Sequence, residues 1–384
     1  MAQGVPAQAS TPCPANPPPR KDPMTLSAAR TRVTHPAHFL SGLTLSEGWT
    51  VLGSTAPSTP YSQGHHSVGY FVRHADGREG FLKAIDLSNV YQAPNVMQEL
   101  QAVSAQFNFE VSLLAMCRNL RMHRVVRAIS HGEERLPGVN VPVPYIIFDR
   151  ADGDVRDHLA ITAIDEVWLL RCIHHVAVGV QQLHIAKLAH NDLKPANILV
   201  FSKDGWKIGD LGTAVDALGK SPHHETAFPG TWEYAPPEAL YFAQSADVWR
   251  DRKRADLYML GGLVTFLFTH QHFNSYLYAE LDEVMRPLFC GGDWEEDFPQ
   301  VLPHLLDAFG RAMRGVSAQL QRRLGPVLAA EVTHSIGELC FPDPLRRGHP
   351  RNLGRADPTG LQQYVSLFDR LAVAAALQRK RRAP

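Results

Sequence analysis

The chain has few cysteines, and none of them are paired in sequence. The five are Cys13, Cys117, Cys172, Cys290 and Cys340, with no Cys-x-x-Cys spacing among them. This scatter argues against a disulfide framework or a cysteine zinc site and fits a reducing compartment. We therefore expect a cytoplasmic protein.

Net charge and long apolar segments are also missing. Lysine plus arginine number 38, and so do aspartate plus glutamate, so we expect neither nucleic-acid nor membrane binding. The longest apolar run, Tyr258 to Thr269, is shorter than the ~20 residues of a membrane span and predicts a buried core helix. No apolar signal-peptide segment stands near the start.

The chain changes character after a tail. Residues 1–37 are rich in proline, alanine, serine and threonine, and such a segment buries too little surface to fold, so it is predicted to be disordered. Met24 is an alternative start that the sequence leaves open. The remaining length is ample for a large core.

A strand-rich region follows from about Trp49. Asp76-Gly77, between two alternating runs, predicts a hairpin turn. Before it, Ser62 to Val68 carries Gly64 among small polar residues, and such a loop can lay backbone N–H groups over phosphates. Lys83 lies in an apolar strand and requires a polar partner. That partner is expected from the next helix, where Glu110 continues the apolar stripe and Glu99 is the rival.

The sequence Ala189 to Val200, A-H-N-D-L-K-P-A-N-I-L-V, carries the chemistry. Phosphoryl transfer from a nucleotide needs a carboxylate for the hydroxyl proton, oxygen ligands for Mg²⁺ and positive charge on the phosphates. Asp192, Lys194 and Asn197 stand here, and Asp210 follows in I-G-D-L-G. The motif G-T-W-E-Y-A-P-P-E at Gly230 and D-P-L-R-R at Asp343 come later.

Together these motifs resemble the eukaryotic-type serine/threonine protein kinase superfamily, in a variant whose catalytic loop lacks the usual Arg-Asp pair. The resemblance implies an α+β, bilobal protein-kinase fold, with a small β-rich N-lobe holding one main helix and a larger, mostly helical C-lobe. We place the N-lobe at 38–149, the C-lobe at 150–372 and a basic tail at 373–384.

The resemblance also implies roles. Asp192 and Lys194 are the catalytic pair, and Asn197 and Asp210 hold Mg²⁺. ATP is expected to contact the remaining candidates, which are Gly64, Val68, Lys83, Glu110, Asp149, Ala151, Asp154 and Leu199. Glu238 is expected to pair with Arg347, and Asp256 to anchor the catalytic loop. Lys194 with Thr231 is typical of kinases that phosphorylate serine and threonine in protein substrates.

Three positions depart from the family pattern. Asn191 replaces an arginine that in many members grips a phosphorylated activation segment, so we hypothesise that activity here needs no such phosphorylation. Serines stand for two glycines of the phosphate-covering loop, and Val68 falls one place before the family valine. Phe81 occupies the position of a small alanine above adenine, which predicts a narrower pocket or a shifted strand register.

Two other functions remain open. The degenerate glycine loop and Asn191 favour a pseudokinase that acts as an ATP-binding scaffold. A small-molecule phosphotransferase of the aminoglycoside or choline kinase type shares the His-x-Asp-x-x-x-x-Asn pattern but lacks the later motifs. The physiological substrate, the oligomeric state and the role of the helical insertion between Gln271 and Cys340 are not readable from the sequence.

Overall fold

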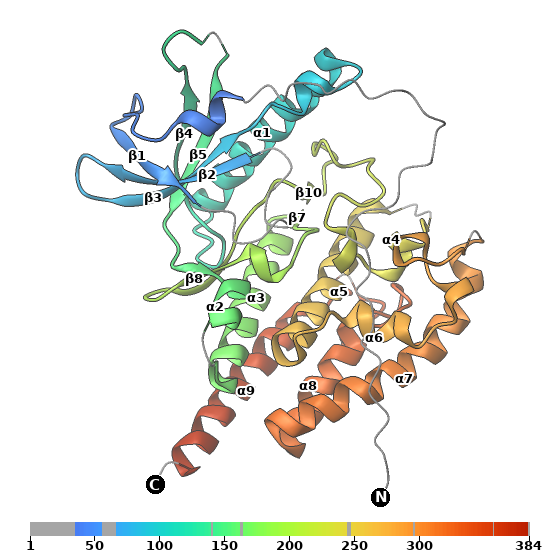
Figure 1. Ribbon diagram of the computed structural model, residues 1–384. Coiled ribbons are helices and arrows are strands. Elements are labelled where there is room, and N and C mark those ends of the chain that lie inside the picture. The colour runs from blue at the N-terminus through green and yellow to red at the C-terminus, as the bar shows by residue number, and fades with distance from the viewer. Residues whose placement is uncertain are drawn as a thin grey trace, which may run out of the picture. The chain divides into compact units, whose positions relative to one another are not determined.

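The computed structural model describes residues 35–55, 67–139, 141–161, 164–243, 247–294, 296–355 and 357–382. They form two compact units, and Figure 1 labels their main helices and strands. The larger unit takes the described residues of 35–229, 248–256 and 361–382, and the smaller takes those of 230–247 and 257–360. This grouping keeps residues on both sides of the predicted lobe boundary, 149 and 150, within the larger unit.

The larger unit contains a five-stranded antiparallel sheet in the order β1-β2-β3-β5-β4. Its strands are β1 (Trp49–Ser54), β2 (Ser67–His74), β3 (Glu79–Ile85), β4 (Ala128–Glu134) and β5 (Val143–Asp149). The predicted hairpin is present: β2 pairs with β3, and the turn between them uses Gly77 at φ 88°. Asp76 Oδ1 accepts the Arg78 N–H at 3.0 Å and closes that turn.

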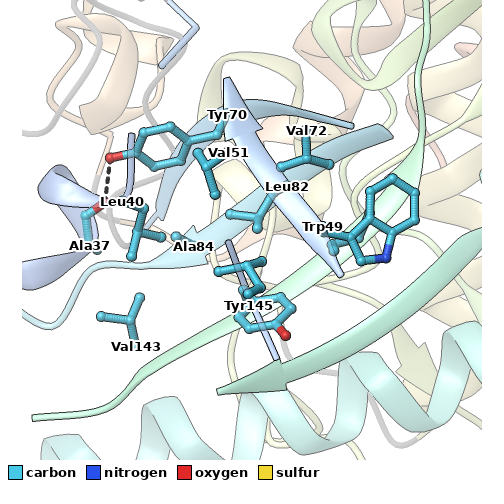
Figure 2. Close-up of a cluster of buried hydrophobic side chains, with 12 residues drawn as sticks. Ala37, Leu40, Trp49, Val51, Tyr70, Val72, Leu82, Ala84, Val143 and Tyr145 are labelled. Carbon is cyan, nitrogen blue, oxygen red and sulfur yellow. Dashed lines mark hydrogen bonds between the residues drawn. The ribbon is translucent and has the colours of Figure 1, made fainter. Parts of the chain in front are cut away.

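One face of this sheet carries a hydrophobic core (Figure 2). Tyr70 and Leu82 are fully buried there, and the Tyr70 hydroxyl donates to the Ala37 carbonyl at 2.6 Å. Ala37 belongs to a 3₁₀ helix, Pro36–Phe39, and is itself fully buried. The predicted tail, residues 1–37, therefore extends too far, because Ala37 packs against the sheet. A single alanine in a segment rich in proline, alanine, serine and threonine gave no apolar signal of this contact.

Helix α1 (Val96–Asn119) follows β3, and its N-terminus is capped by Asn95, whose Oδ1 accepts the Gln98 N–H at 3.1 Å. An apolar cluster of Ile85, Leu87, Val90 and Val103 joins the helix to the end of β3. The 3₁₀ helix Val90–Gln92 lies between β3 and α1, and the apolar cluster holds α1 against the end of the strand that carries Lys83.

The rest of the larger unit alternates helices and short strands. These are β6 (Gly153–Asp154), α2 (Val155–Ile161), α3 (Glu166–Ile185), β7 (Leu188–Ala189), the 3₁₀ helix Pro195–Asn197, β8 (Ile198–Phe201), β9 (Gly205–Ile208), β10 (Val215–Asp216) and the C-terminal α9 (Leu361–Arg382). Helix α9 packs along α3 (Figure 1), where Gln181 Nε2 donates to Gln362 Oε1 at 2.8 Å. Helix α3 also contacts β9 of the hairpin formed by β8 and β9. This hairpin connects Asn197 to Asp210.

The smaller unit is helical. It holds α4 (Pro237–Leu240), most of α5 (Val248–Thr269), α6 (Phe273–Ala279), α7 (Phe298–Leu324) and α8 (Pro326–Leu339), with 3₁₀ helices at Trp232–Tyr234, Glu283–Met285, Leu288–Cys290 and Pro350–Asn352. The apolar run from Tyr258 is a buried helix, as predicted. In the described part of the chain, no helix has both the length and the apolar character of a membrane span.

Candidate active site

The catalytic segment, Ala189 to Asn197, is held by side-chain bonds to its own members. Asp192 is 4% exposed, and its Oδ2 accepts Asn197 Nδ2 at 2.9 Å while Lys194 Nζ lies 2.7 Å away. The Asn197 amide also donates to the Asp192 carbonyl at 2.8 Å. The carboxylate is thereby fixed in a buried position with a cation beside it.

Asp256 is the last residue of the part of α5 that belongs to the larger unit, and it anchors the catalytic segment. It is fully buried, and its two carboxylate oxygens accept the backbone N–H groups of His190 and Asn191, each at 2.8 Å. His184 Nε2 lies 2.8 Å from the same carboxylate. The predicted anchoring role of Asp256 is therefore seen directly.

Asn191 has a backbone reason for its place. Its φ is 62°, in the left-handed region that asparagine tolerates better than most side chains. Its Nδ2 donates to the Ala189 carbonyl at 3.1 Å, and the residue is fully buried. A neutral amide suits this position, since an arginine would need its own buried partner for the charge.

Asn197 and Asp210 fit the requirements of a magnesium site. The Gly209 N–H donates to the Asn197 carbonyl at 2.8 Å, which brings the residue before Asp210 against Asn197. Both nitrogen bonds of the Asn197 amide go to Asp192, and the Asp210 side chain is 46% exposed. Carboxylate and amide oxygens are the ligands that Mg²⁺ prefers, so this donor set fits that ion.

Lys83 links β3 to both acidic partners. Its Nζ donates to Glu110 Oε1 at 3.1 Å and to Asp210 Oδ1 at 2.9 Å. Glu110 is 4% exposed in α1. The structure therefore selects Glu110 over its rival Glu99, and it joins a strand, a helix and the Asp-Leu-Gly motif through one ammonium group.

The electrostatics of this triad follow from burial and proximity. Burial alone would lower the pKa of Lys83, but Asp210 and Glu110 outweigh it and raise that pKa above its usual value. The Lys83 charge lowers the pKa of Asp210 well below its ordinary range. Burial raises the pKa of Glu110 despite the neighbouring lysine. Asp210 is thus held as a carboxylate, the form that binds a metal ion.

Of the other four candidates, Asp149 ends β5, Ala151 lies between β5 and β6, Asp154 ends β6 and Leu199 lies in β8. Asp149 pairs with Arg127, whose Nη2 lies 2.8 Å from Asp149 Oδ1, so its side chain is already engaged. Ala151, two residues after Asp149, is half-buried. Asp154 in β6 pairs with Leu199 in β8, and Leu199 lies two residues beyond Asn197. The Asp154 Oδ1 accepts the Asp157 N–H at 2.9 Å at the start of α2. Their nucleotide contacts stay predictions.

The two candidates of the phosphate-covering loop, Gly64 and Val68, have different outcomes. Gly64 lies outside the described residues. Val68 lies opposite Ala84 and packs on the core face of the sheet with Tyr70, whereas Lys83 points to the opposite face. The structure therefore corrects the expected nucleotide contact of Val68: side chains alternate along a strand, and a one-residue offset turns this valine away.

Phe81 lies in an uninterrupted stretch of strand pairing. It lies opposite Phe71 on β2 and Phe148 on β5, and Lys83, two residues later, lies opposite Gly69 and Ile146. The pairing runs continuously through this position, so no bulge displaces Phe81, and the narrower pocket and the shifted register both stay predictions.

Sequence reasoning missed the bonds that hold the segment after Asp210. Asp216 accepts backbone N–H groups of Leu218, Lys220 and Ser221 at 3.1, 2.9 and 2.8 Å. The Ser221 hydroxyl donates to the Ala214 carbonyl at 2.8 Å. An aspartate whose side chain bonds the backbone N–H two residues on forms an Asx turn, so Asp216 could have indicated a turn here but not its bonds to Lys220 and Ser221.

Three side chains make longer-range contacts with the backbone of that segment. Gln106 Nε2 in α1 donates to the Gly212 carbonyl at 3.1 Å, and His223 Nε2 lies 3.1 Å from the same oxygen. Arg252, 7% exposed, donates to the carbonyls of Ala227, at 3.1 Å, and Thr226. Separations of 11 to 106 residues left no local signal for these partners.

The smaller unit contains the other predicted ion pair. Arg347 is fully buried and contacts Glu238 through two bonds, Nη1 to Oε1 at 2.6 Å and Nη2 to Oε2 at 2.7 Å. The predicted pairing is confirmed. Such a two-pronged pair fixes geometry more than it adds net stability.

Comparison with known proteins agrees with these motifs. The family model described as the protein kinase domain matches residues 65–292, which is more than half of the 384-residue chain. The serine/threonine-protein kinase grp of Drosophila melanogaster is 27% identical over 208 residues, 53% of this chain and 36% of that protein.

Two further relatives are similar over shorter stretches. Activin receptor type-1 of Mus musculus is 33% identical over 125 residues, 28% of this chain and 24% of the receptor. The interferon-induced, double-stranded RNA-activated protein kinase of Mus musculus is 34% identical over 100 residues, 26% of this chain and 18% of that kinase. The matched region thus spans about a third or less of each relative's length.

Proposed function

Because the chain belongs to the protein kinase domain family, we propose that it transfers the γ-phosphoryl group of ATP to serine or threonine hydroxyls of protein substrates. The observation that carries the proposal is the Lys83 network: one ammonium group bonds Glu110 and Asp210, while Asp192 is fixed by Asn197. A binding scaffold has no chemical need for all of these groups at once.

Each residue takes a defined step. Lys83 positions the nucleotide phosphates, and Asn197 and Asp210 would hold Mg²⁺, which neutralises charge on the phosphates when bound. Asp192 orients the substrate hydroxyl and accepts its proton. Lys194, 2.7 Å from Asp192, supplies positive charge beside the carboxylate. Catalysis then consists mainly of positioning and electrostatic stabilisation.

The choice of serine and threonine rests on two supports. Lys194 stands where kinases with this specificity carry a lysine, and the relative from Drosophila is named a serine/threonine-protein kinase. ATP is the donor that the family fold accommodates. The Glu238 and Arg347 pair supports a protein acceptor over a small molecule, because small-molecule phosphotransferases lack the motifs that carry these two residues.

The test is transfer of labelled phosphate from Mg-ATP to a panel of basic proteins and aminoglycosides. We expect protein labelling by the wild-type chain and a loss of ~10³-fold, about 4 kcal/mol of transition-state stabilisation, in Asp192→Asn and in Asp210→Asn. Phosphoamino-acid analysis should find phosphoserine or phosphothreonine. Equal background in wild type and both variants would establish a scaffold instead, and labelling confined to aminoglycosides would establish a small-molecule enzyme.

A further inference from the structure

A cavity of about 410 Å³ opens beside the C-terminal end of α1, within the larger unit. Its lining comes from the last turn of α1, from residues within 121–127, from the end of β5 and from the hairpin of β8 and β9. Cys117, Val125 and Val126 form its buried apolar part. Ligand sites commonly measure about 300 to 1,000 Å³, so this cavity has the size of one. Apart from Asp149, none of its lining residues is a candidate for the active site.

The cavity lining carries more positive than negative charge. Its two carboxylates are both paired: Arg127 binds Asp149 through two bonds, at 3.0 and 2.8 Å, and Lys207 Nζ lies 2.9 Å from Asp204 Oδ2. Two further arginines line the cavity beyond these pairs. The lining therefore has an excess of two positive charges, in a chain whose total charge is zero.

The two excess charges are Arg118 and Arg121, which are both exposed. Among the residues that the structure describes, neither arginine side chain has a hydrogen bond or an ion pair. A guanidinium group presents a planar fork of N–H donors that matches the oxygens of a phosphate in two parallel bonds. Two unengaged forks at one cavity are therefore suited to an anion that carries several oxygens.

Arg121 occupies a backbone position that disfavours arginine. Its φ is 53°, in the left-handed region, where the Arg121 N–H bonds the Arg118 carbonyl and the Met122 N–H bonds the Cys117 carbonyl, each at 3.0 Å. This pair of bonds is a common helix ending, and glycine or asparagine usually stands at its left-handed residue because a larger side chain crowds the backbone there. In the described part of the chain, no bond of the Arg121 side chain offsets that cost.

His123 supplies a neutral donor to the same cavity. Gln182 Oε1 accepts the Arg124 N–H at 3.1 Å, which orients the amide so that its Nε2 donates to His123 Nδ1 at 2.9 Å. The proton of the neutral ring is therefore on Nε2. Burial, with smaller contributions from Arg124 and Lys207, lowers the pKa of His123. The ring thus stays neutral in positive surroundings.

We propose that this cavity binds a phosphate monoester, with Arg118 and Arg121 binding the phosphate oxygens and His123 donating to one of them. A phosphorylated hydroxyl carries about −1.5 to −2 charges at pH 7, which matches the excess of two positive charges. A carboxylate carries one charge and would leave one arginine unbalanced. A phosphoserine side chain of a peptide and a free phosphate ester present the same group, and titration with both distinguishes these sources.

The first test is calorimetric titration of the full chain, in chloride buffer without Mg²⁺, with O-phospho-L-serine and with a phosphoserine peptide. Combining Arg118→Gln with Arg121→Gln should weaken binding of both probes ~10-fold or more. Tighter binding of the peptide identifies a phosphorylated protein as the source, and equal affinities identify the free ester. A wild-type chain that binds neither probe, or that binds the unphosphorylated peptide as well, overturns the proposal.

The matched control removes the same charge elsewhere. Arg314 and Arg322 are exposed on α7 in the smaller unit, and glutamine at both positions should change the affinity by less than about 2-fold, since exposed charges far from a ligand are screened by salt. Equal losses in the two double variants would show general charge attraction and overturn the site.

Two measurements locate the bound phosphate. Lys83→Met removes the cation expected to position nucleotide phosphates, and it should leave the affinity for phosphoserine unchanged. The proton NMR signal of the His123 ring, assigned with His123→Gln, should shift as O-phospho-L-serine is added to the wild-type chain. Binding that is lost in Lys83→Met, or a His123 signal that does not move, would place the phosphate elsewhere and overturn the proposal.

Arg121→Gly separates a binding role from a structural one. Glycine relieves the left-handed backbone, so thermal unfolding should occur at the same or a higher temperature while phosphoserine binding weakens. A variant that unfolds earlier and binds as tightly as wild type would assign Arg121 to the fold and overturn its role in the site. All of these tests measure binding or unfolding, so they can fail or succeed whether or not the chain transfers phosphate.

Discussion

The catalytic segment and the sheet face that carries Lys83 satisfy their constraints in different ways. The catalytic segment is fixed by buried polar bonds, in which Asp256 accepts two backbone N–H groups and Asp192 accepts the Asn197 amide. Apart from the Lys83 bonds, the sheet face is fixed by packing, with Phe81 filling the space above Gly69. Apart from Asn191, the first retains the residue types of the family, whereas the second exchanges them.

The difference teaches where sequence can vary. A buried polar group that loses its partner carries a desolvation penalty, so bonded positions tolerate few replacements. A packed position tolerates a change of size when a neighbour compensates. Asn191 agrees with this distinction, because its backbone N–H, which every non-proline residue has, bonds Asp256 while its side chain departs from the family.

The largest effect is expected from Asp256→Ala, which tests whether buried polar bonds hold the catalytic segment. Two buried N–H groups lose their acceptor at 1–3 kcal/mol each, so we expect about 3 kcal/mol or more of stability to be lost and phosphotransfer to fall by ~100-fold or more. Urea unfolding and labelling assays measure the two effects. Asp256→Asn, which keeps one acceptor oxygen, should lose less of both.

Asp307→Ala is the matched control for that experiment. Asp307 is 74% exposed on α7 and pairs only on the surface with Arg311. Its loss should change the free energy of unfolding by less than about 0.5 kcal/mol. If the two aspartate variants unfolded at the same urea concentration, the buried anchor would not be the support that its geometry indicates.

Arg252→Met sharpens the comparison at the segment after Asp210. Arg252 binds the carbonyls of Ala227 and Thr226, so this segment is held without a phosphate. We expect protein-substrate phosphorylation to fall ~10-fold through kcat/KM while the Kd for Mg-ATP stays unchanged. Arg252→Lys should recover part of the activity, and Arg314→Met, an exposed position on α7, should have no effect.

Phosphatase treatment completes that test. If Arg252 and Asp216 hold the segment, the dephosphorylated wild-type chain should retain its activity. Activity that disappears on dephosphorylation and returns when Thr226 is phosphorylated would contradict the hypothesis drawn from Asn191.

The smallest effect is expected from pH at His175, which supports β9 by accepting the Trp206 N–H at 3.2 Å. Burial, with a smaller contribution from Arg124, lowers the pKa of His175 from 6.5 to about 3. The unfolded state then binds more protons between these values, so the free energy of unfolding falls as pH is lowered through that window. His175→Gln should show a flatter dependence between pH 7 and 5 in thermal unfolding, and parallel curves would refute the assignment.

Much of the site was predictable because its signals are local. Asp192, Lys194 and Asn197 lie within six residues, and the helical stripe separated Glu110 from Glu99. The Glu238 and Arg347 pair is 109 residues apart, and it was predictable only through the resemblance. The residues outside the described range, including Gly64, keep their role as a prediction.

The failures have physical causes. Val68 was misplaced because strand side chains alternate, and an offset of one residue reverses the face. Ala37 was assigned to the tail because composition does not show a single buried methyl group under a sheet. Gln106 and Arg252 act through backbone carbonyls, which every residue has, so no side-chain pattern identifies their partners.

The Gly212 carbonyl has a consequence for signalling. A carbonyl oxygen has two lone pairs and can accept two hydrogen bonds, and this one is contacted by Gln106 from α1 and by His223 from the segment after Asp210. Helix α1 and the segment after Asp210 are therefore joined through one atom of the Asp-Leu-Gly motif. Any effector that moved either donor would alter the affinity of the other for that oxygen, and by linkage the influence would run equally in both directions.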